Sequence, residues 1–163
     1  MITLKVIIDK QQLIVLDDNS VLREYAISTG KNGVGEKYGS EKTPRGLHII
    51  RAKIGSDCEP NTIFIKRRPT GEIFTPDLRD QFPTRDWILT RILWLSGLEV
   101  GKNRLGDNDT MRRFIYIHGT PDDIPMGIPG SKGCIRMRNK DIMELFDQVP
   151  VFTQLHIQET EQG

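Results

Sequence analysis

Short apolar runs separated by turn residues are the feature that most restricts the fold of this chain. In the first run, Ile2, Leu4, Val6 and Ile8 alternate with other residues, the period of a strand with one buried face. Similar runs recur along the sequence. We expect strands at residues 2–8, 13–16, 21–28, 47–54, 62–66, 87–95, 114–118 and 152–157. A helix is the alternative for residues 87–95, because an apolar run that short fits either structure.

Helical spacing occurs in one segment only. Apolar residues from Ile142 to Phe146 follow it, with Asn139 as the expected N-cap, Asp141 in the first turn and Pro150 as the stop. Strands that do not alternate with helices argue against a parallel sheet. We therefore predict a mainly β fold, an antiparallel sandwich or barrel of about eight strands with one short helix.

Two stretches carry no periodicity. Residues 30–46 are rich in glycine but lack the spacings of phosphate-binding loops, so they predict turns and loop. Residues 67–86 hold three prolines and many charges, which predicts a long surface loop. Its arginines, such as Arg79 and Arg85, suggest a lid over an acidic ligand as an alternative to a solvated loop.

The bulk composition excludes several classes of protein. The 163 residues suit one domain spanning 1–163, and 23 basic against 22 acidic residues argue against nucleic-acid binding. No run of about 18 apolar residues predicts a membrane span. The N-terminus lacks the pattern of a secretory signal, so we expect a cytoplasmic protein if the chain is complete. Oligomeric state stays open.

Cys134 is the candidate nucleophile. Gly130 and Gly133 precede it, so the backbone there can bend sharply and approach a ligand. The N–H groups of Gly133 and Cys134 could then form an oxyanion hole. Ser131 would support the turn. His118, at the mouth of an apolar strand, is the expected base, since a thiol needs a neighbouring imidazole to become a good nucleophile. The alternative is that Cys134 is a small buried hydrophobe.

The other candidates are weaker. His48 and His156 lie inside apolar strands. Cys58 stands between Asp57 and Glu59, whose charges oppose thiolate formation, so we expect an unreactive thiol. These residues are dispersed without ligand spacing, so we predict no metal site and no cofactor.

Several motifs together resemble the L,D-transpeptidase (YkuD-type) catalytic domain. The resemblance runs from about Val6 to Ile157, nearly the whole chain. It is carried by Ser28-Thr29-Gly30, Thr43-Pro44-Arg45-Gly46, His118-Gly119-Thr120, Ser131-x-Gly133-Cys134-Ile135-Arg136-Met137, and the helix with Asn139, Asp141 and Leu145.

This resemblance implies a chemistry. Cys134 would attack the carbonyl between a diamino acid, typically meso-diaminopimelate, and D-alanine in a peptidoglycan stem. His118 would accept the thiol proton and pass it to the leaving D-alanine, and the Gly119 carbonyl would orient the imidazole. Arg136 would hold a substrate carboxylate with its planar guanidinium group. The alternative, given equal weight, is that Arg136 pairs with an internal acid and is structural. The expected partners are stem peptides or muropeptides.

One position departs from the family pattern. Lys132 stands where a histidine is usual, two residues before the nucleophile. We expect Lys132, with Ser131 and Arg136, to contact substrate. Without an export signal the chain would meet soluble fragments, which favours an L,D-carboxypeptidase that releases D-alanine. The alternatives are an L,D-transpeptidase and a non-catalytic module that binds peptidoglycan fragments.

Overall fold

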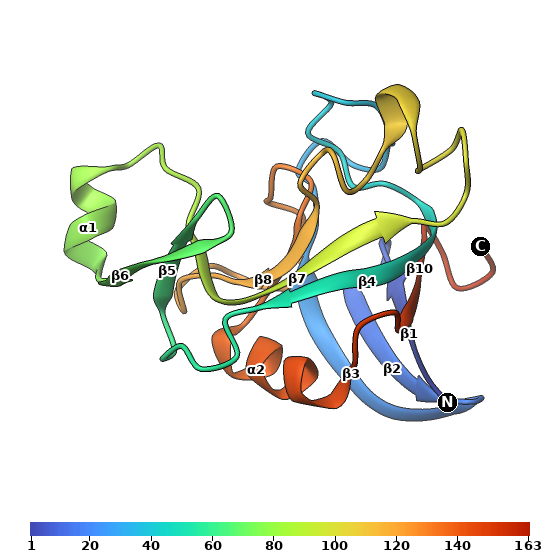
Figure 1. Cartoon of the computed structure of the whole chain (residues 1–163), viewed down its shortest axis with the longest axis horizontal. Coiled ribbons are helices and arrows are strands. Elements are labelled where there is room, and N and C mark those ends of the chain that lie inside the picture. Colours follow the sequence, from blue (N-terminus) through green and yellow to red (C-terminus); the bar gives the residue numbers. More distant parts are fainter.

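One sheet of ten strands organises the protein, whose computed structural model describes residues 1–163 (Figure 1). The strands are β1 Ile2–Ile7, β2 Gln12–Asp17, β3 Ser20–Ser28, β4 Gly46–Ile54, β5 Thr62–Ile65, β6 Arg68–Ile73, β7 Ile88–Gly97, β8 Tyr116–Gly119, β9 Ile135–Met137 and β10 Gln154–Gln158. The helices are α1 Pro76–Gln81, α2 Asn139–Gln148 and the 3₁₀ turn η1 Gly106–Asn108.

The strand order closes the sheet on itself. It runs β4-β10-β1-β2-β3-β9-β8-β7, and a further pairing of β7 with β4 completes a barrel of eight strands. Strand β5 pairs with β7 outside this ring, and β6 pairs with β5. The predicted mainly β barrel is therefore confirmed. Closure leaves the barrel strands without free edges, which would otherwise invite pairing with other chains.

The core fills the barrel. Every one of its eight strands contributes side chains to the main buried cluster, among them Leu13, Ile27 and Leu93. Helix α2 adds Ile142, Leu145 and Phe146 to this cluster and packs on β7 and β8. The apolar spacing of α2 thus predicted its buried face correctly.

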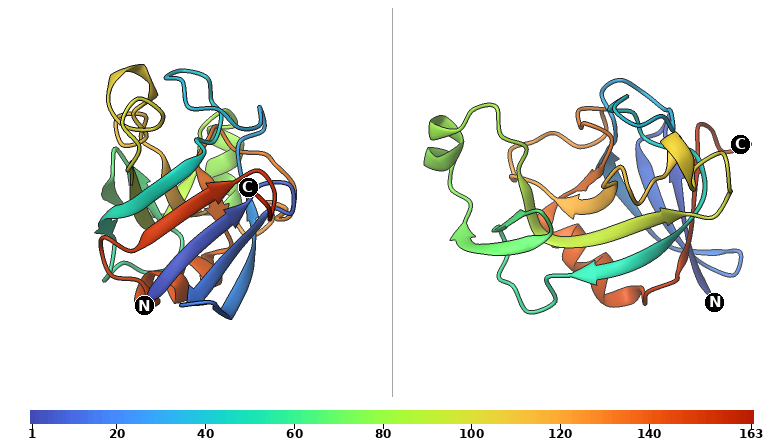
Figure 2. Two further views of the ribbon diagram at one scale, coloured as in Figure 1. Left: turned by 90° about the vertical axis from the view of Figure 1, so that its right-hand side faces the viewer. Right: turned by 45° about the horizontal axis from the view of Figure 1, so that its top comes forward.

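Two of the pairings are parallel. Strand β1 pairs with β10, which lies beside it (Figure 2, left), and β8 pairs with β9. The other pairings are antiparallel, as expected. The β8–β9 pair matters most for function, because it sets two segments with site residues side by side.

The loop predicted at residues 67–86 is wrong. Residues 68–73 form β6, which makes a hairpin with β5, and α1 follows it on the part of the molecule farthest from the termini (Figure 1). Thr75 caps α1 by accepting a hydrogen bond from the Leu78 N–H, and Pro76 follows the cap. These two residues are a helix-start signal. No residue of β6 or α1 is buried, so neither shows apolar periodicity.

The remaining differences are small. Residues 88–95 lie in β7 and Trp87 directly precedes it, so the strand was the correct alternative. Strand β9 has only three residues and was not predicted. Arg138 occupies the N-cap position of α2, and Asn139 is the first helical residue. The Asn139 side chain donates a hydrogen bond to Asn61 and does not cap the helix.

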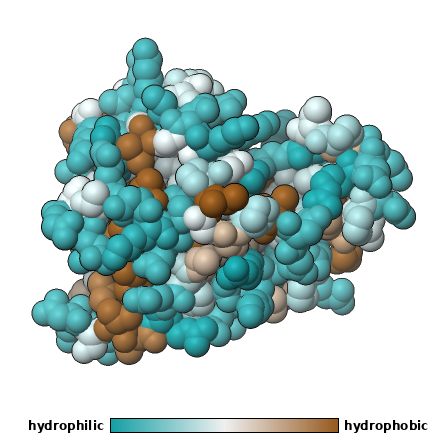
Figure 3. Space-filling model, turned by 180° about the vertical axis from the view of Figure 1, so that it is seen from behind, coloured by the Kyte–Doolittle hydropathy of each residue, from teal (hydrophilic) through white to brown (hydrophobic).

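The surface carries both hydrophilic and hydrophobic residues. The face opposite to that of Figure 1 is mostly hydrophilic, with hydrophobic residues in a few separate patches (Figure 3). Such patches are ordinary on a folded domain. None of the helices has the length and apolar character that a membrane crossing requires.

Candidate active site

The pairing of β8 with β9 sets His118 beside the segment that Cys134 directly precedes. His118 stands opposite Arg136, and Ile117 opposite Ile135, in a parallel register. Both isoleucines are fully buried in the barrel core. Because side chains alternate along a strand, His118 and Arg136 point to the other face, and so does Cys134, two residues before Arg136. The predicted nucleophile and base therefore share one face of this strand pair.

The turn before Cys134 is held by hydrogen bonds inside the loop. The Ser131 hydroxyl donates to the Cys134 carbonyl (2.5 Å) and accepts from the Gly133 N–H (3.1 Å). Thr43 Oγ1 donates to the Gly133 carbonyl at 2.9 Å. Gly133 has φ +117°, a conformation that favours glycine. Ser131 thus supports the turn as expected.

These bonds correct two expectations. The Ser131 hydroxyl is used within the loop and Ser131 is buried, so it does not face a substrate. The Gly133 N–H is also engaged, so its half of the predicted oxyanion hole is not formed in this conformation. The Cys134 N–H donates no hydrogen bond within the protein and is free for an oxyanion.

The surroundings of Cys134 favour a neutral thiol. Burial raises its pKa to about 12, against the opposing effect of the Tyr116 N–H, which donates to Sγ at 3.3 Å. The thiol itself donates to the Phe114 carbonyl at 3.4 Å. The nearby Asp86 carboxylate raises the pKa further, and Arg136 and Arg113 lower it. Nucleophilic attack from this state needs a base that removes the thiol proton as the bond forms.

His118 has the protonation state that the expected base would need. Its Nδ1 lies 2.6 Å from the Gly119 carbonyl, which can only accept, so Nδ1 carries the hydrogen and Nε2 keeps its lone pair. Nε2 is buried without a hydrogen-bond partner in the protein, a state that costs about 1–3 kcal/mol. Burial lowers the pKa of His118, with Asp86 opposing this, so the imidazole is neutral. The contact predicted for Gly119 is present.

Gly119 is glycine because its neighbours leave no room. A Cβ at this position would lie 2.3 Å from Asn139 Oδ1 and 2.7 Å from the Leu89 carbonyl. The backbone therefore approaches both residues closely, and the carbonyl that holds His118 is fixed between β7 and α2.

Asn139 joins this arrangement through a polar network that the sequence did not reveal. Its Nδ2 donates to Asn61 Oδ1 (2.9 Å) and Asp122 Oδ1 (3.1 Å). Its Oδ1 accepts from the Thr90 hydroxyl at 2.5 Å. Thr90 has φ +76°, an uncommon conformation for a β-branched residue and one that tends to occur near functional sites. We expected Asn139 to be a helix cap, which is wrong because its side chain faces inward.

A cavity of about 380 Å³ opens at Cys134. Four cationic residues line it, Lys66, Arg67, Arg113 and Lys132, against one acid, Asp86. This balance favours an anionic substrate. Arg67 is fixed above the Trp94 and Phe114 rings (4.7 and 4.8 Å) and donates to the Tyr116 hydroxyl at 2.9 Å.

The segment 67–86 thus reaches the site from both ends. Arg67, at the tip of the β5–β6 hairpin, and Asp86, before β7, both line this cavity. Arg79 and Arg85 line a neighbouring cavity. Arg68 is exposed. No residue between these two ends is buried, as expected for a solvated segment, and a lid over the ligand stays a prediction.

Arg136 is bound to other residues of the protein, and Lys132 is not. Arg136 donates to the Gly130 carbonyl (3.0 Å) and pairs with Asp86 (3.3 Å), the internal acid that was one of its two expected partners. Lys132 is exposed and forms no ion pair, and it lines the cavity of Cys134. It is free to contact a ligand.

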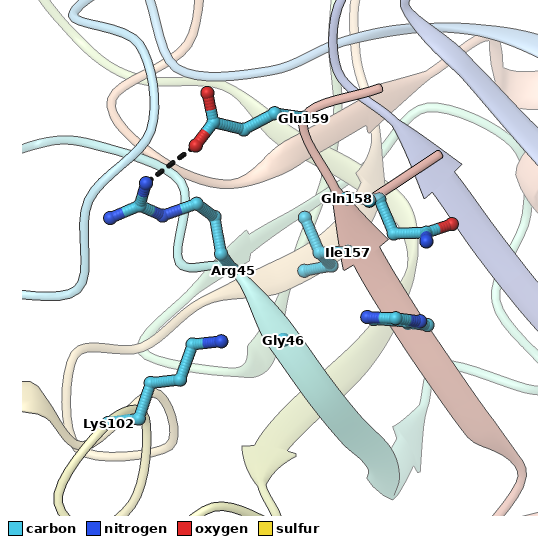
Figure 4. A pocket seen from close by; sticks show the side chains of 8 residues that line it. Arg45, Gly46, Lys102, Ile157, Gln158 and Glu159 are labelled. Atoms are coloured by element: carbon cyan, nitrogen blue, oxygen red, sulfur yellow. Dashed lines mark hydrogen bonds and ion pairs between the residues drawn. The ribbon is translucent and has the colours of Figure 1, made fainter. Parts of the chain in front are cut away.

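A larger cavity of about 470 Å³ lies elsewhere, between Arg45, Lys102, His156 and Glu159 (Figure 4). Arg45 there donates to Glu159 at 2.6 Å. This cavity is lined by none of the predicted catalytic residues. His48 is buried, with its ring bonded to Gly46 and Thr110.

The other thiol, Cys58, is free and half-buried against a minor cluster that includes Tyr116. No three His, Cys, Asp or Glu side chains are grouped so that they could hold a metal ion.

Comparison with known proteins agrees with this geometry. The family model of the YkuD L,D-transpeptidase catalytic domain matches residues 3–157. The putative L,D-transpeptidase YqjB of Bacillus subtilis (strain 168) is 29% identical over 154 residues, which cover 93% of this chain and 69% of YqjB. The probable L,D-transpeptidase ErfK/SrfK of Salmonella typhimurium is 51% identical over 45 residues, which are 28% of this chain and 15% of that protein.

The fold matches as well. L,D-transpeptidase 3 from Mycobacterium tuberculosis, solved with a faropenem-derived adduct, superposes with a TM-score of 0.58 at 16% identity, over 97% of this chain and 60% of that one. The chain therefore spans less than two thirds of the length of several relatives that it matches. Since the family model covers nearly all of its residues, this chain belongs to the YkuD L,D-transpeptidase catalytic domain family.

Proposed function

We propose that this protein is a cysteine acyl-transfer enzyme that cleaves the bond between the diamino acid and D-alanine of peptidoglycan tetrapeptide stems. We propose further that water is the acceptor, which makes it an L,D-carboxypeptidase. The observation that carries the catalytic proposal is the pair formed by a neutral Cys134 thiol and a neutral His118 whose Nε2 is unprotonated, on one face of β8–β9.

Acylation follows from these protonation states. The Cys134 proton moves to His118 Nε2 while Sγ bonds to the stem carbonyl carbon, and the Cys134 N–H donates to the oxygen that becomes negative. The Gly119 carbonyl at Nδ1 stabilises the imidazolium that forms. The C–N bond then breaks, and His118 returns its proton to the amine of the departing D-alanine.

Deacylation reverses the roles. Water attacks the thioester carbonyl while His118 Nε2 takes its proton, the C–S bond breaks, and the proton passes to Sγ. The neutral thiol is restored and the tripeptide leaves with a new carboxylate. Four cationic residues around Cys134 support a substrate that carries carboxylates.

Transpeptidation is the second candidate, favoured by the names of the relatives that match this chain. It shares the acyl-enzyme and differs only in the acceptor, an amine of a second stem or a D-amino acid. A non-catalytic module is the third, since Lys132 replaces a histidine that is usual in the family.

Purified protein incubated with a tetrapeptide muropeptide tests the reaction. Mass spectrometry should show tripeptide and free D-alanine with the wild type, and neither with Cys134→Ala or His118→Ala. Cys58→Ala removes the other thiol and is the matched control, expected to stay active. Cross-linked dimers or exchanged D-amino acids without tripeptide would overturn the hydrolytic proposal.

A covalent probe separates an enzyme from a binding module. A carbapenem should add its mass to the wild type and to Cys58→Ala, and the modified peptide should contain Cys134. Absence of both adduct and turnover would favour the non-catalytic module.

A further inference from the structure

We propose that a second, smaller cavity beside the nucleophile is a subsite for a free carboxylate of the substrate, formed by Arg85, Trp87, Lys132 and Arg136. This inference rests on the proposed function in that the ligand is a stem peptide. It adds residues from the segment before β7 that neither the resemblance nor the reaction calls for.

Unpaired buried donors carry the inference. Six buried side-chain nitrogen or oxygen atoms of the protein have no hydrogen-bond partner, and three of them are Arg85 Nη2, Trp87 Nε1 and Arg136 Nε. All three residues line one cavity of about 200 Å³. Each of these atoms can only donate. Buried polar groups are normally paired, so three donors without partners on residues that line one small space indicate an acceptor ligand.

The charges around this cavity favour an anion. Arg79 is paired with Asp123, and Arg136 with Asp86, so these pairs are nearly neutral. Arg85 and Lys132 form no ion pair and leave the cavity with an excess of positive charge. Asp86 also lines the cavity, and its carboxylate is held by Arg136 at 3.3 Å.

The geometry is prepared before a ligand arrives. Trp87 is buried and its ring packs edge-on against Phe74, with centroids 5.0 Å apart. The Arg85 guanidinium stacks on the Trp87 ring, 4.6 Å from its centroid. A stacked guanidinium loses less freedom when it binds a planar carboxylate than a free side chain would.

The position of the cavity connects it to the reaction. Asp86 and Lys132 line both this cavity and that of Cys134, so the two spaces adjoin. A stem that presents its scissile carbonyl to Cys134 has two candidate carboxylates within a residue of that bond. One is the terminal carboxylate of D-alanine, and the other is the carboxylate on the side chain of the diamino acid.

Binding to a Cys134→Ala protein tests the subsite without turnover. Four tetrapeptides are titrated by calorimetry, with the terminal group as acid or amide and with diaminopimelate or lysine as the third residue. Lysine lacks the side-chain carboxylate. We expect removal of one of these carboxylates to weaken binding by about 10-fold to 100-fold, the range for a charge-assisted hydrogen-bonded contact. The peptide series thereby identifies which carboxylate is bound.

Variants then assign the effect to this cavity. In the same background, Arg85→Gln and Trp87→Phe should weaken binding of the acid by about 10-fold and leave the analogue without that carboxylate unchanged. Arg85→Lys should recover part of the loss, because it keeps the charge without the fork. Arg104→Gln, at an exposed arginine of the β7–β8 loop, is the control for net charge.

Two outcomes would overturn the subsite: equal binding of acid and analogue in both pairs, or a carboxylate preference that Arg85→Gln and Trp87→Phe leave intact. A circular-dichroism melt shows whether each variant is folded. Arg85 is only half-buried, so Arg85→Gln tests the subsite even if Trp87→Phe disturbs the packing of the core. Failure of the proposed reaction appears separately, as an absence of tripeptide with wild-type protein.

Discussion

Gly119 shows how a single residue supports the chemistry. Its carbonyl holds Nδ1 of His118 at 2.6 Å and thereby leaves Nε2 as the atom that accepts a proton in the proposed reaction. Asn139 and the Leu89 carbonyl leave no space for a side chain at this position. The role of Gly119 thus depends on close packing, since its φ is not in the left-handed region.

We expect Gly119→Ala to lower kcat by about 100-fold, because a displacement of roughly 1 Å in a catalytic group costs that much. The new Cβ would push the carbonyl away from Asn139 and tilt the imidazole. The measurement is kcat for D-alanine release. Gly35→Ala is the control, since its Cβ would meet only the flexible side chain of Lys42. Equal kcat values for the two variants would contradict the role given to Gly119.

Individual residues were predictable where a motif named them. Cys134, His118 and Gly119 belong to short motifs whose spacing the sequence displays, and the structure puts these motifs on two paired segments. Trp87 and Asp86 belong to no such motif, because they reach the site through the path of the chain before β7. The engagement of the Gly133 N–H by Ser131 also could not be predicted, since it depends on one rotamer in a turn.

Elements meet at the start of α2, where the helix, β7 and the segment before β5 share one polar network. Asn139 connects Thr90, Asn61 and Asp122 within it. Gly119 packs directly against Asn139, so this junction supports the His118 carbonyl from behind. In the proposed reaction these residues are positioning residues, because their hydrogen bonds join them to one another and not to Cys134 or His118.

We expect Asn139→Ala to destabilise the fold by about 2 kcal/mol, since it leaves the Thr90 hydroxyl and the Asn61 amide without their buried partner. The variant should also lower kcat more than it changes KM. Urea unfolding gives the first quantity and steady-state kinetics the second. Lys140→Ala, at the exposed next position of α2, is the control. A loss of stability with unchanged kcat would mean that Asn139 stabilises the fold but does not position His118.

Elements with a buried face of several residues were predictable, and short or fully exposed elements were not. Alternation marked β1, and helical spacing marked α2, because both contribute to the core. All residues of β6 are exposed, so its sequence has no alternation to detect. Strand β9 is three residues long, too short for a periodic pattern.

The whole barrel contains two histidines that folding buries in the neutral state. His48 lies in β4 with Nδ1 bonded to the Gly46 carbonyl and Nε2 to the Thr110 hydroxyl. Burial lowers its pKa to about 4, and burial also lowers the pKa of His118. In the unfolded chain both imidazoles return to an ordinary pKa of about 6.5. Folding therefore excludes protons that the unfolded chain would bind.

The free energy of unfolding should consequently decrease as the pH is lowered, before the carboxylates titrate. As the pH drops from about 6.5 to 4, the unfolded state takes up a proton at His48 that the folded state does not, and the free energy of unfolding decreases. The difference of about 2.5 pKa units corresponds to about 3 kcal/mol for His48, and His118 acts in the same direction. Urea unfolding at a series of pH values measures the slope. His48→Asn, whose amide can still donate to the Gly46 carbonyl, should be less stable at pH 7 and show a shallower slope. Equal slopes for wild type and His48→Asn would mean that His48 is not the group that couples the stability of the barrel to pH.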